Sequence, residues 1–423
     1  MKPPSTTGMR AAALLIALFS VGFFFIRLAP YAARPTGGFI AYYTSGAMLL
    51  RGSEMGALYD DHQFVKNTLA ITGLESEDYF RSNPPTLAFL MAPFSSLPIA
   101  QAKLLWEIFS LACIVAGIFL FITLFALTPI ESLVFSAFAF GFSPLYANFV
   151  WGQVYAPLLL LHILLMKFWM EKKELLSAIA IVLLLLLKGY GLMFLFVAIF
   201  QKQWKVVAYS IVIYAASIAV SSAAIGFETW TAYAASLLKL ITSLAPAATF
   251  QQNIQSLVSW VFVQDRWNSH PILLMPGIAG PLVLVLVTGG VFILYRFAVW
   301  AGSVNSPLPL AAAVIVGVLT APILFDYHYT LILPSIVIAY RYFPSPARAF
   351  DYILFGLSLL LLTPKIPYHT SFFQDSWIGI LGFPRIHGSI LLLWLLARTL
   401  SSRKELDPTI QSPLWMPPAA GAK

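Results

Sequence analysis

The segment Asp326-Tyr327-His328-Tyr329 places ionisable side chains between two apolar runs, residues 308–324 and 330–340. Ionisable groups inside membrane segments are costly, so they usually line a cavity or take part in chemistry. A carboxylate such as Asp326 can accept the proton of an attacking hydroxyl, and an imidazole such as His328 can assist it. The alternative interpretation is a short loop in which the two residues merely join two helices.

Two cationic residues, Lys188 and Arg81, also lie within or next to apolar segments. Lys188 interrupts the apolar run of residues 183–200, and two glycines follow it within three positions. A lysine in such a run either extends toward the membrane interface or pairs with an anion such as a lipid phosphate. The glycines open the backbone around it, which favours an anion site. Arg81 precedes a double proline that starts a helix well, where it would suit an anion or lie at the interface.

Uncharged polar side chains that can hydrogen-bond to sugar hydroxyls are spread over four segments. They are Tyr42, Tyr43, Asn83, Gln153, Asn253 and Gln255. Each type also has a structural use, because tyrosines form belts at membrane interfaces and amides cap helices. Residues 41–51 around the tyrosines could form an amphipathic helix that lies at the interface.

The elements that position these residues are membrane helices. Hydrophobic residues make up 60% of the 423 and charged residues only 10%, whereas a soluble domain has about 25% charged residues. The chain is therefore an all-α polytopic membrane protein. Candidate apolar segments cover about residues 11–29, 84–97, 104–127, 130–147, 152–170, 175–187, 189–200, 206–226, 281–299, 308–324, 328–343, 350–363 and 386–400.

Several kinds of chemistry have no sequence signal. The single cysteine, Cys113, lies inside an apolar segment and cannot form an intrachain disulfide. No zinc spacing, nucleotide-binding glycine loop or Ser-His-Asp pattern is visible, so we expect neither a metal nor a cofactor. The basic residues behind the net charge of +8 are scattered over segment ends, as membrane topology requires, and do not indicate nucleic acid.

Basic connections predict the topology, because cytoplasmic loops are rich in Lys and Arg. Four such connections, at 171–174, 202–205, 341–348 and 398–404, are expected inside the cell. Residues 1–33 lack a small-residue cleavage site and are expected to hold the first transmembrane helix, with the N-terminus inside. If every apolar segment between residues 84 and 170 crossed the membrane, the basic connection 171–174 would lie outside the cell. We therefore expect that one of those segments does not cross.

This topology gives one membrane domain over residues 1–400 and a disordered cytoplasmic tail over 401–423. The long loops at about 34–83, 227–279 and 364–385 then share the outer face with Lys188, Asp326 and His328. The first of these loops holds six acidic residues, namely Glu54, Asp60, Asp61, Glu75, Glu77 and Asp78. The convergence of these polar groups indicates a functional site on the outer face.

Taken in order, these pieces resemble glycosyltransferase family 87, whose members are polytopic enzymes of the GT-C class. The resemblance covers residues 12 to about 400. It rests on the order and spacing of Phe39-Ile40-Ala41-Tyr42-Tyr43, Gly52 and Leu58-Tyr59-Asp60; Asn83-Pro84-Pro85, Ala92-Pro93 and Leu97-Pro98; Trp151-Gly152-Gln153; Lys188; Asn253 with Gln255-Ser256; and Ala321-Pro322 before Asp326-Tyr327-His328-Tyr329.

The resemblance implies a bundle of about twelve transmembrane helices, with interfacial helices in the first outer loop, in a bacterial plasma membrane. It also implies a reaction in which an acceptor hydroxyl of a glycolipid or glycan attacks a polyprenyl-phosphate sugar, with inversion and without a metal. Lys188 or Arg81 would stabilise the leaving phosphate. The tyrosines and amides named above would contact the sugar or the acceptor.

One departure from the family pattern concerns the base. The family usually carries an Asp just before the Phe-x-x-Tyr-Tyr run, and this chain has Gly37-Gly38 there. Asp60, Asp61 or Asp326 could replace it, with His328 assisting or contacting the phosphate. Alternatively, the chain uses a different acceptor, or it has lost transfer and is a non-catalytic binder or flippase of lipid-linked sugars. A secondary transporter or a structural subunit are further alternatives, although no internal repeat supports a transporter.

Overall fold

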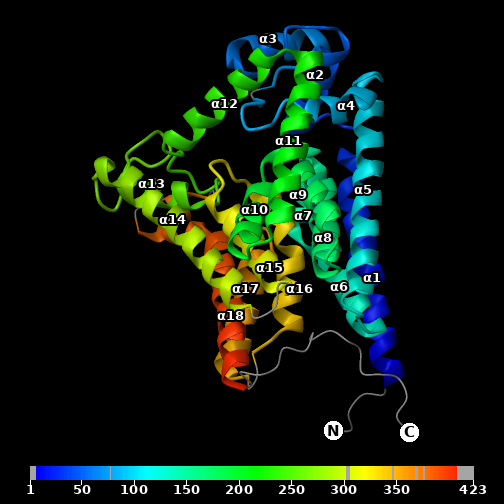
Figure 1. Ribbon diagram of the computed structural model, residues 1–423, viewed down its shortest axis with the longest axis vertical. Coiled ribbons are helices and arrows are strands. Elements are labelled where there is room, and N and C mark those ends of the chain that lie inside the picture. The colour runs from blue at the N-terminus through cyan, green and yellow to red at the C-terminus, as the bar shows by residue number, and fades with distance from the viewer. Residues whose placement is uncertain are drawn as a thin grey trace.

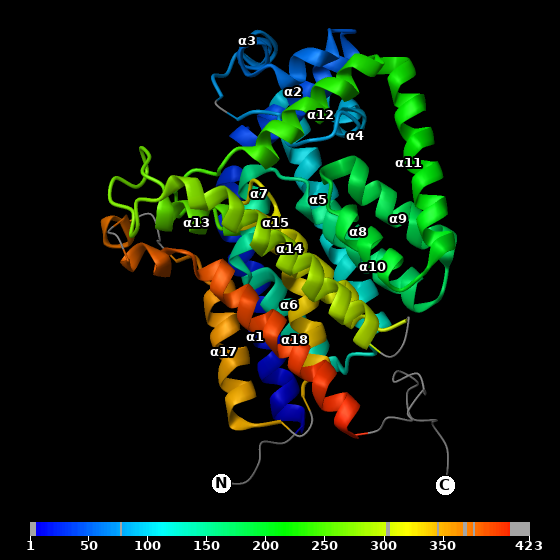
Figure 2. The same cartoon turned by 60° about the vertical axis from the view of Figure 1, so that its left-hand side comes forward.

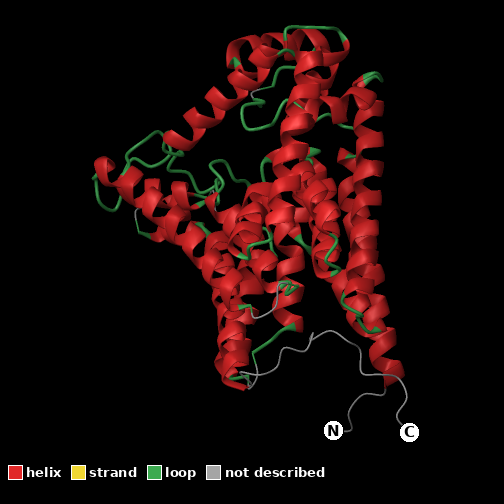
Figure 3. Cartoon of the chain, in the orientation of Figure 1, coloured by secondary structure: helices red, strands yellow, loops and turns green. Residues whose placement is uncertain are grey.

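The computed structural model describes residues 6–76, 78–301, 305–344, 347–366, 370–374 and 377–406. Within these ranges the chain forms helices and no strands (Figure 3). The all-α prediction is therefore confirmed. Most of the predicted tail, from residue 407 onward, lies outside the described residues.

Four helices of the described ranges are long and apolar enough to cross a membrane. A spanning helix needs about 20 apolar residues. These four are α1 (Thr6–Leu28), α5 (Ile99–Leu124), α11 (Trp204–Ile225) and α14 (Pro276–Trp300). A fifth candidate span is a broken one, in which α6 (Pro129–Gly141) and α7 (Ser143–Trp151) meet at a bend of 49°. The chain thus has the character of a membrane-embedded protein.

Shorter helices complete the bundle beside the long ones (Figure 1). They are α8 (Tyr155–Met170), α9 (Glu174–Lys188), α10 (Gly191–Phe200), α15 (Leu308–Thr320), α16 (Leu333–Arg341) and α17 (Ala349–Leu362), with the longer α18 (Pro384–Leu406) closing the chain's described part. A 3₁₀ segment, η3 (Asp326–Ile332), leads into α16. The count of about twelve spans stays a prediction.

Ion pairs join the basic connections that were predicted to share one face. Lys205 Nζ lies 3.4 Å from Glu174 Oε2, so the connections before and after the α9–α10 pair meet. Arg398 Nε lies 2.6 Å from Asp351 Oδ1, and this pair joins the start of α17 to the C-terminal part of α18. The start of α1 and the end of α18 both lie at the end of the molecule opposite α3 and α12 (Figures 1 and 2). Which end faces the cytoplasm stays a prediction.

The first long connection folds into a helical cap. Its elements are η1 (Ala29–Tyr31), α2 (Gly37–Leu50), η2 (Met55–Tyr59), α3 (Asp61–Thr72) and α4 (Leu87–Ser95). The nine residues of α4 rise only about 13 Å at 1.5 Å per residue, whereas a bilayer core is about 30 Å thick. The predicted segment 84–97 is therefore too short to cross, which agrees with the expected failure of one piece between 84 and 170.

The amphipathic interpretation of α2 is wrong, whereas its place at the membrane interface stays a prediction. This helix packs along α4 and is buried from Gly38 to Met48. Tyr42 and Tyr43 are only 2% and 9% exposed, so they are not belt residues. Both hydroxyls donate to acceptors inside the protein, as described below.

The second long connection contains α12 (Phe227–Thr242) and α13 (Ile254–Phe262). Helix α12 runs obliquely from the upper end of α11 toward α13 (Figures 1 and 2). Two short 3₁₀ segments, η4 (Ser371–Gln374) and η5 (Ile378–Gly382), precede α18. Contacts of η2 with α12 join the two long connections above the bundle.

Candidate functional site

Three polar features lie where the long connections meet the bundle. We call the first the lysine cluster, formed by Lys188, Asn83, Tyr42, Gln153 and Asp78. We call the second the arginine cluster, formed by Arg385, Asp326, Gln252, Tyr329 and Ser143. The third is a cavity beside α12, called the α12 cavity.

Lys188 is the last residue of α9, where the turn to α10 begins. Its ammonium donates to Asn83 Oδ1 and lies 5.8 Å from the ring centre of Tyr42. Asn83 is 3% exposed and is held on both sides, because its Nδ2 donates to Phe80 O at 3.2 Å and its own carbonyl accepts from Tyr59 at 2.9 Å. The structure thus brings a predicted phosphate ligand and two predicted sugar contacts together.

Gln153 joins this cluster through Tyr42, whose hydroxyl donates to Gln153 Oε1 at 2.6 Å. The amide of Gln153 also lies against Gly38. A Cβ on Gly38 would overlap Gln153 Nε2 and would lie 2.9 Å from Trp151 O. Residue 38 is therefore a glycine because α2 approaches the end of α7 closely.

Asp78 reaches the same place from the far end of the first connection. Its carboxylate lies against Gly37, so that a Cβ on Gly37 would overlap Asp78 Oδ2. The carboxylate also acts electrostatically on Lys188 and Tyr42. Sequence reasoning did not single Asp78 out, because nothing in the local pattern distinguishes it from the other acidic residues of that loop.

His328 faces the lysine cluster. Its ring stacks on Tyr327, with centres 4.7 Å apart, and lies tilted against Tyr155, with centres 4.5 Å apart. The backbone N–H of Phe325 donates to its Nδ1 at 3.1 Å, so the neutral ring carries its proton on Nε2. Lys188 acts electrostatically on this ring.

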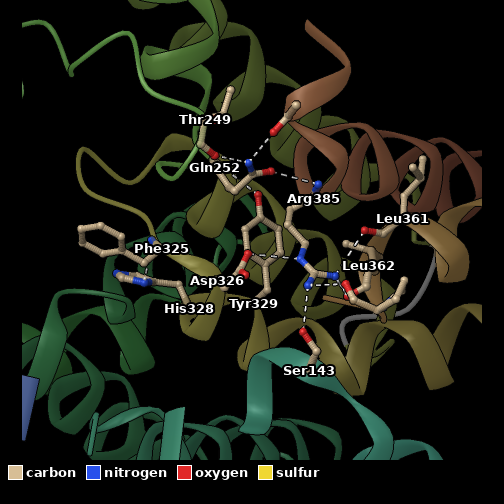
Figure 4. Close-up of polar contacts among 12 residues, drawn as sticks. Ser143, Thr249, Gln252, Phe325, Asp326, His328, Tyr329, Leu361, Leu362 and Arg385 are labelled. Atoms are coloured by element: carbon tan, nitrogen blue, oxygen red, sulfur yellow. Dashed lines mark hydrogen bonds and ion pairs between the residues drawn. The ribbon is translucent and has the colours of Figure 1, made fainter. Parts of the chain in front are cut away.

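Asp326 lies only two residues away, yet it faces the arginine cluster (Figure 4). Arg385, the second residue of α18, is fully buried, and its Nε lies 3.4 Å from Asp326 Oδ1. The guanidinium donates to five acceptors, namely Asp326 Oδ1, Ser143 Oγ, and the carbonyls of Leu361, Leu362 and Pro364. Asp326 is thereby one of several anchors that hold α18 against η3, α7 and α17.

Gln252 completes the arginine cluster. Its Oε1 accepts from the backbone N–H of Arg385 at 3.2 Å, and its Nε2 donates to Gly382 O at 2.8 Å. Its own carbonyl accepts from the Tyr329 hydroxyl at 2.6 Å. Only the place of Arg385 at the start of an apolar run hinted at this role in the sequence.

The α12 cavity has a volume of about 590 Å³. The first connection, α12 and the segments around Gln251 and Pro322 line it. Gln251 and Gln255 are only 8% and 6% exposed, yet their Oε1 atoms have no hydrogen-bond partner within the described part of the chain. Arg81 and Lys239 contribute positive charge to the lining.

Asp60 and Asp61 also line this cavity, and both have structural partners. Asp60 caps α3 by accepting from the backbone N–H of Gln63 at 3.0 Å. Asp61 accepts two hydrogen bonds from Arg81, one of them from Nε at 2.6 Å. The bonded carboxylate raises the pKa of Arg81 above its usual value.

Two predicted contacts lie elsewhere. Asn253 is fully buried, caps α13 by accepting from Ser256 N at 2.7 Å, and donates to the carbonyls of Ala321 and Pro322. Tyr43 donates to Leu97 O at 2.9 Å, at the junction of α4 and α5. Neither side chain is brought to the lysine cluster.

Comparison with known proteins identifies the family. Neither the curated proteins nor the solved structures contain a match to this chain. A model of glycosyltransferase family 87 matches residues 81–325, more than half of the chain. The matched range includes Asn83, Gln153, Lys188 and Gln255. The chain therefore belongs to glycosyltransferase family 87, which implies a membrane glycosyltransferase.

Proposed function

We propose that this chain transfers a hexose or pentose from a polyprenyl-phosphate donor to a hydroxyl of a glycolipid or glycan acceptor. The transfer occurs at the outer face of a bacterial plasma membrane, with inversion and without a metal. Family membership supports the reaction class. The donor, the acceptor and the side of the membrane are our own assignments from the site.

The observation that carries the proposal is the environment of Lys188. Its ammonium lies at a helix end, held by the buried amide of Asn83 beside the ring of Tyr42. When the bond between the sugar and the phosphate breaks, negative charge develops on the phosphate oxygen. A cation already fixed in place stabilises that charge without reorganising.

The α12 cavity supports a substrate that carries both hydroxyls and charge. Unpaired amide oxygens on Gln251 and Gln255 can accept hydrogen bonds from sugar hydroxyls. Arg81 and Lys239 can attract a phosphate. Other side chains of α12, such as Leu238 and Ile241, are 62% and 55% exposed and can lie against acyl or prenyl chains.

The proposed orientation follows from the paired basic connections. If the end that carries the Lys205–Glu174 and Arg398–Asp351 pairs faces the cytoplasm, both termini are cytoplasmic. The lysine cluster and the α12 cavity then lie toward the outer face. A polyprenyl-phosphate donor and a glycolipid acceptor would both reach them from the outer leaflet.

Transfer by purified protein in nanodiscs tests the proposal. The assay supplies radiolabelled polyprenyl-phosphate sugars and an acceptor extract, and we expect saturable transfer from at least one donor. Lys188→Met should reduce transfer by about 10²- to 10³-fold. Lys205→Met, which changes an exposed lysine at the start of α11, should retain it. The absence of transfer from every donor by the unaltered chain would contradict the proposal.

A non-catalytic binder or flippase of lipid-linked sugars is the second candidate. It is favoured by one observation, namely that Asp60, Asp61 and Asp326 each have a structural partner. The glycine at position 38 does not favour it, since the approach of Gln153 explains that residue. Saturable donor binding without turnover in the same nanodiscs would support this candidate.

A further inference from the structure

We infer that Asp78 is the general base of the transfer, and this inference rests on the proposed function. The acceptor oxygen forms a bond to the anomeric carbon of the donor sugar while the bond from that carbon to the phosphate oxygen breaks. The electron pair of the broken bond leaves with the polyprenyl phosphate. The proton of the acceptor hydroxyl moves to the Asp78 carboxylate.

The position of Asp78 is the first argument. Its carboxylate occupies the space that a side chain at position 37 would fill, at the first residue of α2. Tyr42 lies five residues further along the same helix, and its ring faces Lys188. A glycine at 37 therefore lets a carboxylate from a distant part of the loop lie against the start of α2, the helix that carries Tyr42.

The charges around Asp78 are the second argument. Asp78 attracts Lys188 and also acts electrostatically on Tyr42 and Tyr327, so these groups share one region. A phosphate at Lys188 and an attacking hydroxyl at Asp78 would approach a sugar in that region from two directions. Asp78 is also exposed, so an accepted proton can pass to water.

The other acidic candidates are less suited to move a proton. The carboxylate of Asp60 holds the first turn of α3, and that of Asp61 holds Arg81. Asp326 holds the fully buried Arg385. Protonation of Asp60 or Asp326 would weaken a bond that holds the start of α3 or of α18, and the Asp61 carboxylate is already occupied by Arg81.

Asp78→Asn in the nanodisc assay tests the inference. We expect kcat to fall by about 10²- to 10⁴-fold, as for loss of a general base, while the Kd for the donor changes little. Glu75→Gln is the matched control, because Glu75 is an exposed carboxylate of the same loop. It should keep the unaltered kcat.

Moving the carboxylate from position 78 to position 37 tests whether Asp78 acts in catalysis or in holding the fold. Gly37→Asp alone should be harmful, since its Cβ would overlap Asp78. In an Asp78→Ala background that space is vacated, and Gly37→Asp should restore turnover by at least about tenfold over Asp78→Ala.

Three results would overturn the inference. Unchanged kcat in Asp78→Asn would exclude Asp78 as the base while leaving the proposed function intact, because the unaltered chain still transfers sugar. Parallel loss of donor binding and turnover in Asp78→Asn, without recovery by Gly37→Asp, would assign Asp78 a structural role. Failure of the unaltered chain to transfer any sugar would overturn the function and the inference together.

Discussion

The arginine cluster and the lysine cluster both place a cation near a carboxylate in an apolar protein. They differ in how many N–H donors of the cation have an acceptor within the protein. Arg385 is fully buried and donates to five protein acceptors. The Lys188 ammonium has three donors, and the described part of the chain supplies one hydrogen-bond acceptor, Asn83. A cation whose donors are all used within the protein holds the fold, whereas a cation with donors left over can bind an anion.

The same contrast separates Asp326 from Asp78. Asp326 lies in a short ionisable motif between apolar runs, and the fold uses it as an anchor for α18. Asp78 lies in an acidic loop without a motif, and the fold brings it to Lys188 and Gly37. The more conspicuous carboxylate in the sequence is thus the one paired with a buried arginine, and substitutions in each cluster can test whether its role is structural.

Loss of Arg385 should have the largest effect. Arg385→Ala leaves the Asp326 carboxylate and several carbonyls without their partner, which should lower the free energy of unfolding by about 3–5 kcal/mol. Thermal unfolding in detergent measures this, and labelling of the buried Cys113 by a thiol-reactive dye reports it independently. Arg34→Ala, at an exposed arginine, should leave both readouts unchanged. An unfolding temperature of Arg385→Ala equal to that of the unaltered chain would refute the structural role.

Loss of the Lys188 charge should affect activity without affecting stability. Lys188→Met keeps most of the side-chain length and should reduce kcat by about 10²- to 10³-fold, the usual effect of removing one group that stabilises developing charge. The temperature of thermal unfolding should change little, because the substitution removes no more than the hydrogen bond to Asn83. A fall in unfolding temperature as large as that of Arg385→Ala would show that Lys188, like Arg385, stabilises the fold.

Asp326→Asn should have the opposite profile. The amide keeps the shape of the side chain but loses the charge that faces Arg385. We expect the free energy of unfolding to fall by about 1–3 kcal/mol and the turnover per folded molecule to stay within about threefold. Turnover measured after removal of aggregated protein decides this, and a large loss of kcat in well-folded protein would return Asp326 to the list of bases.

Substitution in the α12 cavity should have a smaller effect. Gln255→Ala removes a buried oxygen that has no partner in the described chain. If that oxygen accepts from a substrate hydroxyl, KM should rise by about two- to tenfold for one lost hydrogen bond, with kcat nearly constant. Gln203→Ala, near the opposite end of the bundle, is the control. Equal KM values for the two variants would remove Gln255 from the binding site.

The Asp61–Arg81 pair should contribute least to stability. Both side chains are more than a third exposed, and exposed ion pairs contribute about 0–1 kcal/mol. Asp61→Asn should therefore shift thermal unfolding very little, although it frees Arg81 to bind an anion in the cavity. The measurement is thermal unfolding at low and at high salt. A salt-dependent loss of stability as large as that of Arg385→Ala would show that an exposed ion pair can contribute as much as a buried one.

The sequence predicted the helices and four of the five members of the lysine cluster, all but Asp78. Apolar length and scattered charge were enough for the all-α membrane protein, and Lys188 stood out because it interrupts an apolar run. Asn83 and Gln153 followed from their positions at helix boundaries. Local pattern could not pair Lys188 with Asn83 across 105 residues, or Arg385 with Asp326 across 59. Those pairings depend on tertiary packing, as does the return of Asp78 to Gly37.

The arginine cluster also sets an order of events during synthesis. Arg385 meets Ser143, which precedes it by 242 residues. At about 5–20 residues per second, roughly 12–50 seconds separate the two at the ribosome. During that interval the carbonyls at the end of α17 and the carboxylate of Asp326 lack the guanidinium that will satisfy them. The contacts of Arg385 can form only after α18 has been synthesised, so any factor that assists assembly would be needed until then.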